Sequence, residues 1–233
     1  MRELLAVEFV LPVLIALLLL TMRDSLLLGV ISLITSLTSL TASLILLFEV
    51  IHVGPVNVEL VSEWLRLPYI KPIDISFTLD PLNGLVSSLV CGLTALILTY
   101  SISYMRMDGK YSDTRRYWIL MLVFMASMLV VINSDNFILM FVGWEGMSLC
   151  SYLLIGYYYG DEREYWIGGP PNKAPLYRPS YSSFITFLIV GCADALMLLG
   201  ILMLVTLVGS PYYEDLAIML AGRGIPEWLV IFS

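Results

Sequence analysis

Three carboxylic acids stand inside strongly apolar stretches of the chain: Glu8, Glu145 and Asp194. At the centre of a membrane helix such a group costs roughly 2.5–3.5 kcal/mol, so it usually has a partner or a function. Glu8 stands near the start of its stretch, where we expect the side chain to reach the membrane interface. Asp135 begins another stretch, and a carboxylate there predicts a helix cap.

Glu145 and Asp194 are predicted to lie at the same depth in the membrane. If one helix ends near Tyr158 and the next begins near Tyr181, each carboxyl group is 13 residues from the ends that their loop joins. At 1.5 Å per residue that depth is about 20 Å, close to the middle of the hydrocarbon core. We expect both side chains to face the bundle interior, because lipid would leave their cost uncompensated.

The chemistry that this placement favours is proton transfer. Burial disfavours a charged carboxylate and a nearby cation favours it, so a group balanced between the two effects can take up and release a proton near neutral pH. Glu145 lies in the run Gly143-Trp144-Glu145-Gly146-Met147-Ser148, whose glycines leave space and whose hydroxyl can extend a hydrogen-bonded chain. The alternative is a structural carboxylate bonded to a neighbouring helix. The apolar stretches offer no Lys, Arg or His, so either the two carboxyl groups act largely protonated or a cation comes from another chain.

Composition places these groups in a membrane protein. Of the 233 residues 59% are hydrophobic and 13% are charged, and the mean hydropathy is +0.90. Soluble proteins carry about 25% charged residues. Hydropathy predicts an all-α integral membrane protein with about six spans. They run near residues 4–22, 26–48, 77–105, 117–133, 135–158 and 181–208.

The loops suggest three regions and an orientation. Residues 1–76 hold two spans and a polar extracytoplasmic segment, residues 77–208 hold four spans, and residues 209–233 form an interfacial segment with the start of a seventh apolar run. Eight of the twelve basic residues fall in the loops on one side, which predicts that this side is cytoplasmic. Within the second span Ser32, Ser36, Ser39 and Ser43 share one face, which favours close helix packing over a pore lining.

Several function classes are disfavoured. The net charge of −7 and the lack of a Lys/Arg cluster argue against nucleic acid as a partner. Cys91, Cys150 and Cys192 are far apart and are interpreted as small buried apolar residues, so no metal site is predicted. The sequence contains no phosphate-binding glycine motif, so we expect no nucleotide on this chain.

The run from Asp135 to Tyr158, with Gly-Trp-Glu-Gly at its centre, resembles the fifth helix of the largest antiporter-like subunit of respiratory complex I, called subunit L in bacteria and chain 5 in mitochondria. Leu79-Asp80-Pro81-Leu82-Asn83-Gly84-Leu85 resembles the start of that family's third helix. The resemblance implies the first half of an antiporter-like bundle with inverted repeats. It implies that Glu145 is the glutamate essential for proton translocation and that Asp194 modulates it. Gly143, Trp144 and Gly146 would shape the pocket.

The sequence departs from this family in three ways. Gly191 stands where the family usually has an arginine, three residues before the aspartate. The loop that contains residues 168–181 is longer than the family's connection. The family's seventh helix, whose lysine pairs with the glutamate, lies beyond the sequence. We therefore expect another chain to supply helix 7 onward, after a gene split, or the sequence to be part of a longer chain.

The resulting hypothesis is a proton-translocating membrane subunit of a complex I-like NADH:quinone oxidoreductase. It would belong to the enzyme without a redox centre of its own, because NADH, FMN, iron–sulfur clusters and quinone are expected in partner subunits. Its partners would be lipid and the other membrane subunits, in a mitochondrial inner or prokaryotic plasma membrane. The alternatives are a structural or assembly subunit of such a complex, and part of a sodium/proton antiporter or membrane hydrogenase.

Overall fold

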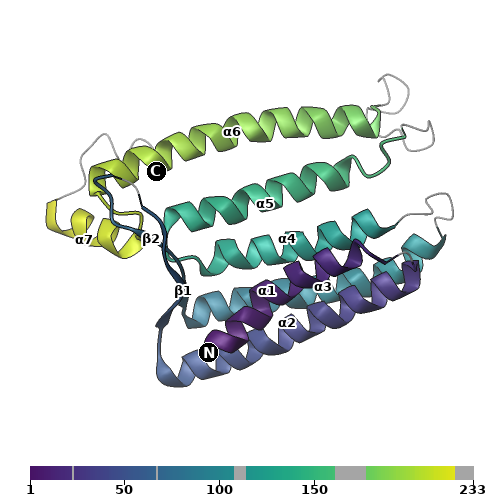
Figure 1. The fold of residues 1–233 in the computed structure, drawn as a ribbon, viewed down its shortest axis with the longest axis horizontal. Helices are drawn as coiled ribbons and strands as arrows, with labels where there is room; N and C mark the ends of the chain where they lie inside the picture. The colour runs from purple at the N-terminus through teal and green to yellow at the C-terminus, as the bar shows by residue number, and fades with distance from the viewer. Residues whose placement is uncertain (23, 67, 108–113, 161–176, 224–233) are drawn as a thin grey trace.

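The computed structural model describes residues 1–22, 24–66, 68–107, 114–160 and 177–223. It shows helices lying roughly side by side, with a β-hairpin and a short helix at one end (Figure 1). The elements are α1 (Arg2–Leu19), α2 (Ser25–Val53), β1 (Val56–Leu65), β2 (Ile73–Leu79), α3 (Pro81–Met107), α4 (Arg115–Asn133), α5 (Phe137–Ile155), α6 (Pro179–Val208) and α7 (Tyr213–Arg223).

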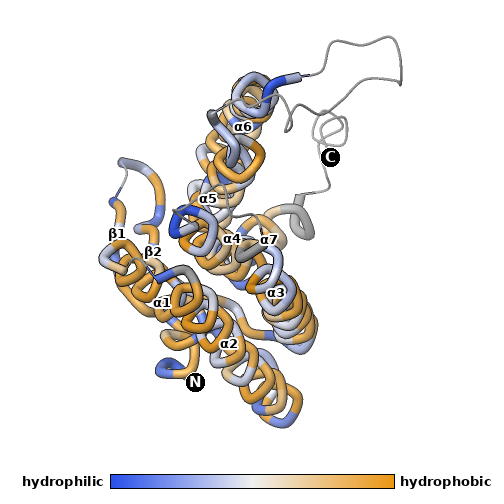
Figure 2. The backbone as a smooth tube through the Cα atoms, turned by 90° about the vertical axis from the view of Figure 1, so that its right-hand side faces the viewer, coloured by the Kyte–Doolittle hydropathy of each residue, from blue (hydrophilic) through white to orange (hydrophobic). Residues whose placement is uncertain are grey.

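The described helices confirm a helical membrane protein. Five of them, α2 to α6, are long and apolar enough to cross a membrane. Helix α1, expected as a further span, is shorter and carries Arg2, Glu3 and Glu8. Hydrophobic residues follow the helices along their length, and many hydrophilic ones gather at the helix ends and in the hairpin (Figure 2). The spans follow the hydropathy of the sequence closely.

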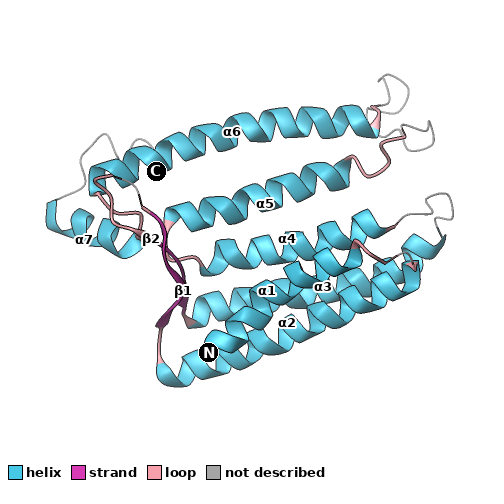
Figure 3. Cartoon of the chain, in the orientation of Figure 1, coloured by secondary structure: helices cyan, strands magenta, loops and turns pink. Residues whose placement is uncertain are grey.

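The segment after α2 corrects the purely helical prediction. It was expected to be a polar connection, but α2 continues to Val53 and an antiparallel hairpin follows (Figure 3). Its register pairs Val56 with Leu79 at one end and Leu65 with Ile73 at the other, with two irregularities between them. In β2 apolar residues recur at every second position, the period of a strand with one buried face.

The serine face of α2 packs inside the bundle, as predicted. Ser32, Ser36, Ser39 and Ser43 are all buried. The Ser36 hydroxyl donates to the Cys91 carbonyl of α3 at 3.2 Å, and Ser43 and Ser88 share a hydrogen bond of 3.0 Å. Small hydroxyl residues thus let α2 and α3 approach closely. Of the three cysteines, Cys91 and Cys150 are buried as expected, whereas Cys192 is exposed.

Two helix boundaries differ from their prediction. Asn136, rather than Asp135, caps α5, because its side-chain oxygen accepts from the Leu139 amide at 2.8 Å. Beyond α6 the chain forms α7, where only an interfacial segment was expected. The seventh apolar run, residues 228–232, lies outside the described residues.

The segment between α6 and α7 fastens this end of the bundle to the hairpin. Gly209 ends α6 with φ of 74°, a left-handed conformation that glycine adopts readily, and its carbonyl accepts from the Lys71 amide at 3.0 Å. The Tyr212 hydroxyl donates to Asp74 at 2.6 Å. The Lys71 ammonium donates to both oxygens of Asp215, at 2.9 and 2.7 Å.

We predict that acid loosens this attachment. Hydrogen bonds from Lys71 and then Ser210 hold the pKa of Asp215 below its usual value. The stabilisation is therefore complete at neutral pH and is lost as the pH falls below about 4, the usual range of an unfolded aspartate. Because the pair is partly exposed, we expect a loss of at most about 1 kcal/mol.

Hydrogen exchange at the Lys71 amide measures this effect. Asp215→Asn should raise the exchange rate at neutral pH and remove its additional rise in acid, after correction for the intrinsic rate. Glu214→Gln, a change at the neighbouring exposed carboxylate, is the matched control and should behave like the unaltered protein. An acid effect that persists in Asp215→Asn would assign it to another group.

Candidate functional site within the membrane

Helices α5 and α6 lie next to each other and supply the candidate site (Figure 1). On α5 the contributing residues follow the three- and four-residue spacing of one helix face, from Trp144 and Glu145 through Ser148 to Tyr152. On α6 the stripe runs from Thr186 through Val190 to Asp194. Each stripe occupies about two turns, so a few polar side chains from both helices meet at one largely apolar cavity.

Asp194 is held at the α5–α6 interface. Its side chain is buried, with the residue only 5% exposed, and the Trp144 indole donates to Oδ1 at 2.8 Å. Its other oxygen, Oδ2, is buried without a hydrogen-bond partner in the described part of the chain. Asp194 Oδ2 is therefore available to form a further hydrogen bond inside the protein. The placement agrees with the expectation that Asp194 faces inward.

Glu145 departs from that expectation, because within this chain it is exposed. It lines a cavity of about 610 Å³ together with Asp194, and the two carboxyl groups are close enough to interact electrostatically. The sequence correctly predicted that they belong together. It could not indicate that Asp194 alone would be covered, since depth along a helix does not fix which side faces a neighbour.

The glycines beside Glu145 bring α5 against α4. A Cβ on Gly143 would lie 2.9 Å from the Ser127 carbonyl oxygen, and one on Gly146 would overlap the Ser127 side chain. These glycines thus allow close approach of the helix backbones, rather than a turn. By fixing α5 on α4, they determine where Trp144 and Glu145 point.

Gly191, the position at which the resemblance implied an arginine, is open. A Cβ built on Gly191 meets no heavy atom within 4 Å, although the residue lines the cavity. No ion pair of Glu145 or Asp194 occurs within the described residues, whose two ion pairs lie at Arg66–Glu63 and Lys71–Asp215. The site thus combines two carboxyl groups with room for a further side chain.

Some cavity residues were not singled out from the sequence. They are Phe124, Met128, Leu149, Thr186, Phe187 and Val190. The α6 members lie four, seven and eight residues before Asp194, on the same face of the helix, so helical spacing alone could have identified them. Phe124 and Met128 lie on α4, and only the packing of the helices shows that they line the cavity.

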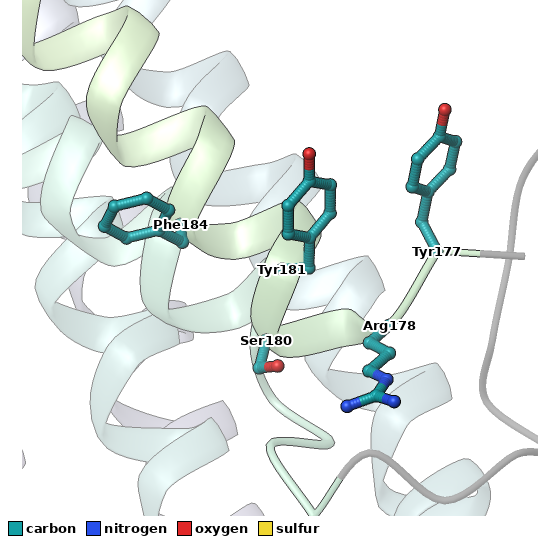
Figure 4. Close-up of a pocket in the computed structure, with 5 residues that line it drawn as sticks. All are labelled: Tyr177, Arg178, Ser180, Tyr181 and Phe184. Atoms are coloured by element: carbon teal, nitrogen blue, oxygen red, sulfur yellow. The ribbon is translucent and has the colours of Figure 1, made fainter. Parts of the chain in front are cut away.

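A second cavity, of about 510 Å³, lies at the start of α6 (Figure 4). There the Tyr177 and Tyr181 rings stack with centroids 5.9 Å apart, as suits anchoring at a membrane interface.

The fold defines a class: helical membrane proteins in which two carboxyl groups line one cavity between spans. Comparison with known families narrows the class. Residues 64–117 match the family described as NADH-Ubiquinone oxidoreductase (complex I), chain 5 N-terminus. Residues 134–233 match the transmembrane family of NADH:quinone oxidoreductase and Mrp antiporters. The chain belongs to this family of antiporter-like membrane subunits and corresponds to the N-terminal part of complex I chain 5.

Individual relatives agree with this assignment. NADH-quinone oxidoreductase subunit L of Escherichia coli is 44% identical over 91 residues, which cover 39% of this chain and 14% of that protein. The same subunit of Rickettsia typhi is 29% identical over 197 residues, covering 84% of this chain and 27% of the relative. The chain thus spans about a quarter or less of the length of these relatives.

Solved structures share the fold. The membrane-bound sulfane sulfur reductase, an archaeal respiratory membrane complex, contains a chain that matches with a TM-score of 0.73 and 16% identity, over 98% of this chain and 32% of that one. The Mrp complex from Dietzia sp. DQ12-45-1b matches with a TM-score of 0.69 and 23% identity, over 99% of this chain and 22% of its counterpart. Among the described residues no cluster of His, Cys, Asp and Glu could hold a metal ion.

We predict that the α4–α5 contact tolerates no side chain at Gly143. Gly143→Ala would place a methyl group against the backbone of Ser127 and should destabilise the protein by roughly 1–3 kcal/mol through overpacking. Gly191→Ala is the matched control, because its Cβ meets open space and should have a much smaller effect. Thermal unfolding of the purified assembly measures both changes. Equal destabilisation by the two variants would show that close approach to α4 is not the cause, because helix propensity by itself favours alanine over glycine.

Proposed function

We propose that this chain is the N-terminal part of a proton-translocating subunit of a complex I-like NADH:quinone oxidoreductase. Glu145 and Asp194 would move protons through the membrane, driven by electron transfer in other subunits. The observation that carries the proposal is the buried carboxyl group of Asp194. One of its oxygens accepts a hydrogen bond, the other has no partner among the described residues, and the group lines the same cavity as Glu145.

The arrangement supports an unequal division of labour between the two acids. The Trp144 indole can only donate a hydrogen bond, so it fixes one oxygen of Asp194 whether or not the carboxyl group carries a proton. Glu145 has no such fixed partner among the described residues and is free to exchange its proton. Because like charges repel, an ionised Asp194 favours the protonated form of Glu145. We therefore assign proton transfer to Glu145 and tuning to Asp194.

The exposure of Glu145 supports the need for further helices. A carboxyl group facing lipid at this depth would lack compensation, whereas helices packed on the open side of α5 and α6 could supply a cation and exclude lipid. The exposed side of α6 is extensive, and it includes Phe184, Phe187, Ile189, Leu196, Leu199 and Met203. Helices that follow in a longer chain, or those of a partner subunit, would occupy this side.

A sodium/proton antiporter remains a second candidate, because the matched transmembrane family includes Mrp antiporters. The carboxyl pair could bind either ion, since carboxylate and hydroxyl oxygens suit hard cations as well as protons. A structural or assembly subunit is favoured instead by the open position at Gly191. Ion transport by the assembled complex separates these possibilities.

We predict that the reactivity of the Cys192 thiol shows whether further helices cover this side of α6. It is exposed on α6, two residues from Asp194, whereas Cys91 and Cys150 are buried. An apolar thiol reagent should modify Cys192 in the chain expressed alone in membranes, and modification should fall at least tenfold in the assembled complex. The two buried cysteines are internal controls and should react in neither sample. Equal modification of Cys192 in both samples would place the partner helices elsewhere.

We predict that Glu145→Gln abolishes most proton transport while leaving the assembly intact. Glutamine preserves the shape and hydrogen-bonding capacity but has no titratable proton. The measurement is proton uptake into vesicles, normalised to electron transfer in the same preparation. Asp194→Asn should have a smaller effect, and the double variant should differ from the sum of the two, because the carboxyl groups share one field.

Glu59→Gln, at an exposed position on the hairpin, is the matched control and should transport normally. Repeating the measurement without sodium identifies the ion, because transport that requires sodium would favour the antiporter. An unchanged ratio of protons to electrons in Glu145→Gln would leave Glu145 a structural carboxylate and remove the proposed function.

A further inference from the structure

The residue before α5 lies at a junction between three parts of the chain. Asn136 is fully buried, and its backbone lies antiparallel to that of Tyr212, in the segment between α6 and α7. Backbone hydrogen bonds join the two segments on either side of this contact, from the Phe137 amide at 3.0 Å and from the Tyr213 amide at 3.2 Å. The start of α5 is thus bonded to the segment in which the chain leaves α6.

The Asn136 side chain forms hydrogen bonds through both ends of its amide group. Its oxygen accepts from the Leu139 amide at 2.8 Å and so caps α5. Its nitrogen donates to the Asp74 carbonyl of β2 at 3.3 Å and to Asp135 Oδ1 at 2.8 Å. These partners fix the orientation of the amide, because the opposite orientation would place donor against donor at Leu139 and acceptor against acceptor at Asp74. A serine or an aspartate could cap α5, but neither has two hydrogens to donate.

The hairpin supports both helices of the candidate site. Asp74, whose carbonyl accepts from the Asn136 amide, also accepts from the Tyr212 hydroxyl through its carboxylate, at 2.6 Å. The Asp74 backbone amide donates to the same hydroxyl at 3.1 Å. In the turn of the hairpin, the Lys71 amide donates to the Gly209 carbonyl at the end of α6. Because α5 and α6 are bonded to the same hairpin, their relative rotation is fixed at this end of the bundle.

This attachment differs from the glycine contact that positions α5 on α4. Gly143 allows the close approach of those two helices, whereas Asn136 relates α5 to the hairpin and to α6. Trp144 follows Asn136 by eight residues, which is about 12 Å along the helix axis at 1.5 Å per residue. A rotation at the start of α5 therefore moves the Trp144 indole. Its 2.8 Å hydrogen bond to Asp194 requires one rotation of α5, because such a bond weakens steeply when it is misaligned.

We propose that Asn136 is a positioning residue for the Glu145–Asp194 pair. By bonding the start of α5 to Asp74, it holds the rotation at which Trp144 reaches Asp194 and Glu145 lines the shared cavity. Asn136 acts through α5 rather than by contact with Glu145, from which nine residues separate it. The inference rests on the proposed function for what the pair does, but the position of the indole can be measured without any transport.

The hydrogen bond of the Trp144 indole is the property to measure. Its N–H band is isolated in the assembled complex by ultraviolet resonance Raman spectroscopy, with each protein compared to its own Trp144→Phe form. Asn136→Ser retains a residue that can cap α5 but removes both amide donors, so the band should shift toward that of an unbonded indole. Asp24→Ser, the same kind of change at the cap of α2, is the matched control and should leave the band in place.

A second variant provides the test if Asn136→Ser does not assemble. Tyr212→Phe removes only the hydroxyl that bonds Asp74, so it should shift the band in the same direction but less, because the backbone contact remains. Tyr69→Phe, at an exposed position in the turn of the hairpin, is its control.

The outcomes separate this inference from the proposed function. An unchanged band in an assembled Asn136→Ser complex would overturn the positioning role, and so would an equal shift in Asp24→Ser. If Asn136→Ser does not assemble, an unchanged band in Tyr212→Phe would have the same meaning. None of these results would affect the proposed function. Normal proton transport by Glu145→Gln would remove the proposed function and leave the band shifts unaltered.

Discussion

The cost of keeping a carboxyl group away from water governs how this chain is built. Each acid within the bundle meets that cost differently. Asp194 receives an indole hydrogen bond on one oxygen. Glu8, which was expected to reach the interface, is instead buried with 1% of the residue exposed, and the Ser43 hydroxyl lies near its carboxyl group. Glu145 remains exposed at the surface of the chain. The first two acids are accommodated by neighbours within the chain. Glu145 has no ion-pair partner among the described residues, and lipid would not compensate its charge.

These solutions depend on how closely the helices approach. Gly143 and Gly146 lack side chains that would hold α5 away from α4. The buried serines of α2 likewise allow α2 to lie close to α3. Small residues at both contacts allow the backbones to approach, so polar side chains nearby are held at fixed positions. The same small side chains therefore determine both how closely the helices pack and where the nearby polar side chains lie.

The sequence predicted the helices and the common depth of Glu145 and Asp194, because hydropathy and depth can be read from residue positions along the chain. It did not predict the hairpin, because alternating residues from Val56 onward lie in a short polar segment interrupted by prolines. Depth placed Glu8 near an interface, but which side of α1 is covered depends on tertiary packing. The pairing of Trp144 with Asp194 likewise requires the relative rotation of α5 and α6, which no single-helix pattern contains.

The two halves of the bundle differ in how complete they are. The apolar core is built mainly from α1 to α4, where residues such as Leu98, Trp118, Leu122 and Leu129 are buried. Helix α6 instead packs chiefly on α5, and only about a sixth of its most apolar window is buried, 17% against 44% for α4. Apolar residues do not need protein around them in lipid, but a carboxyl group does. The proposed site thus lies where this chain's own packing is thinnest. For the proton exchange that we propose, such a position leaves the Glu145 carboxyl group accessible to a further helix.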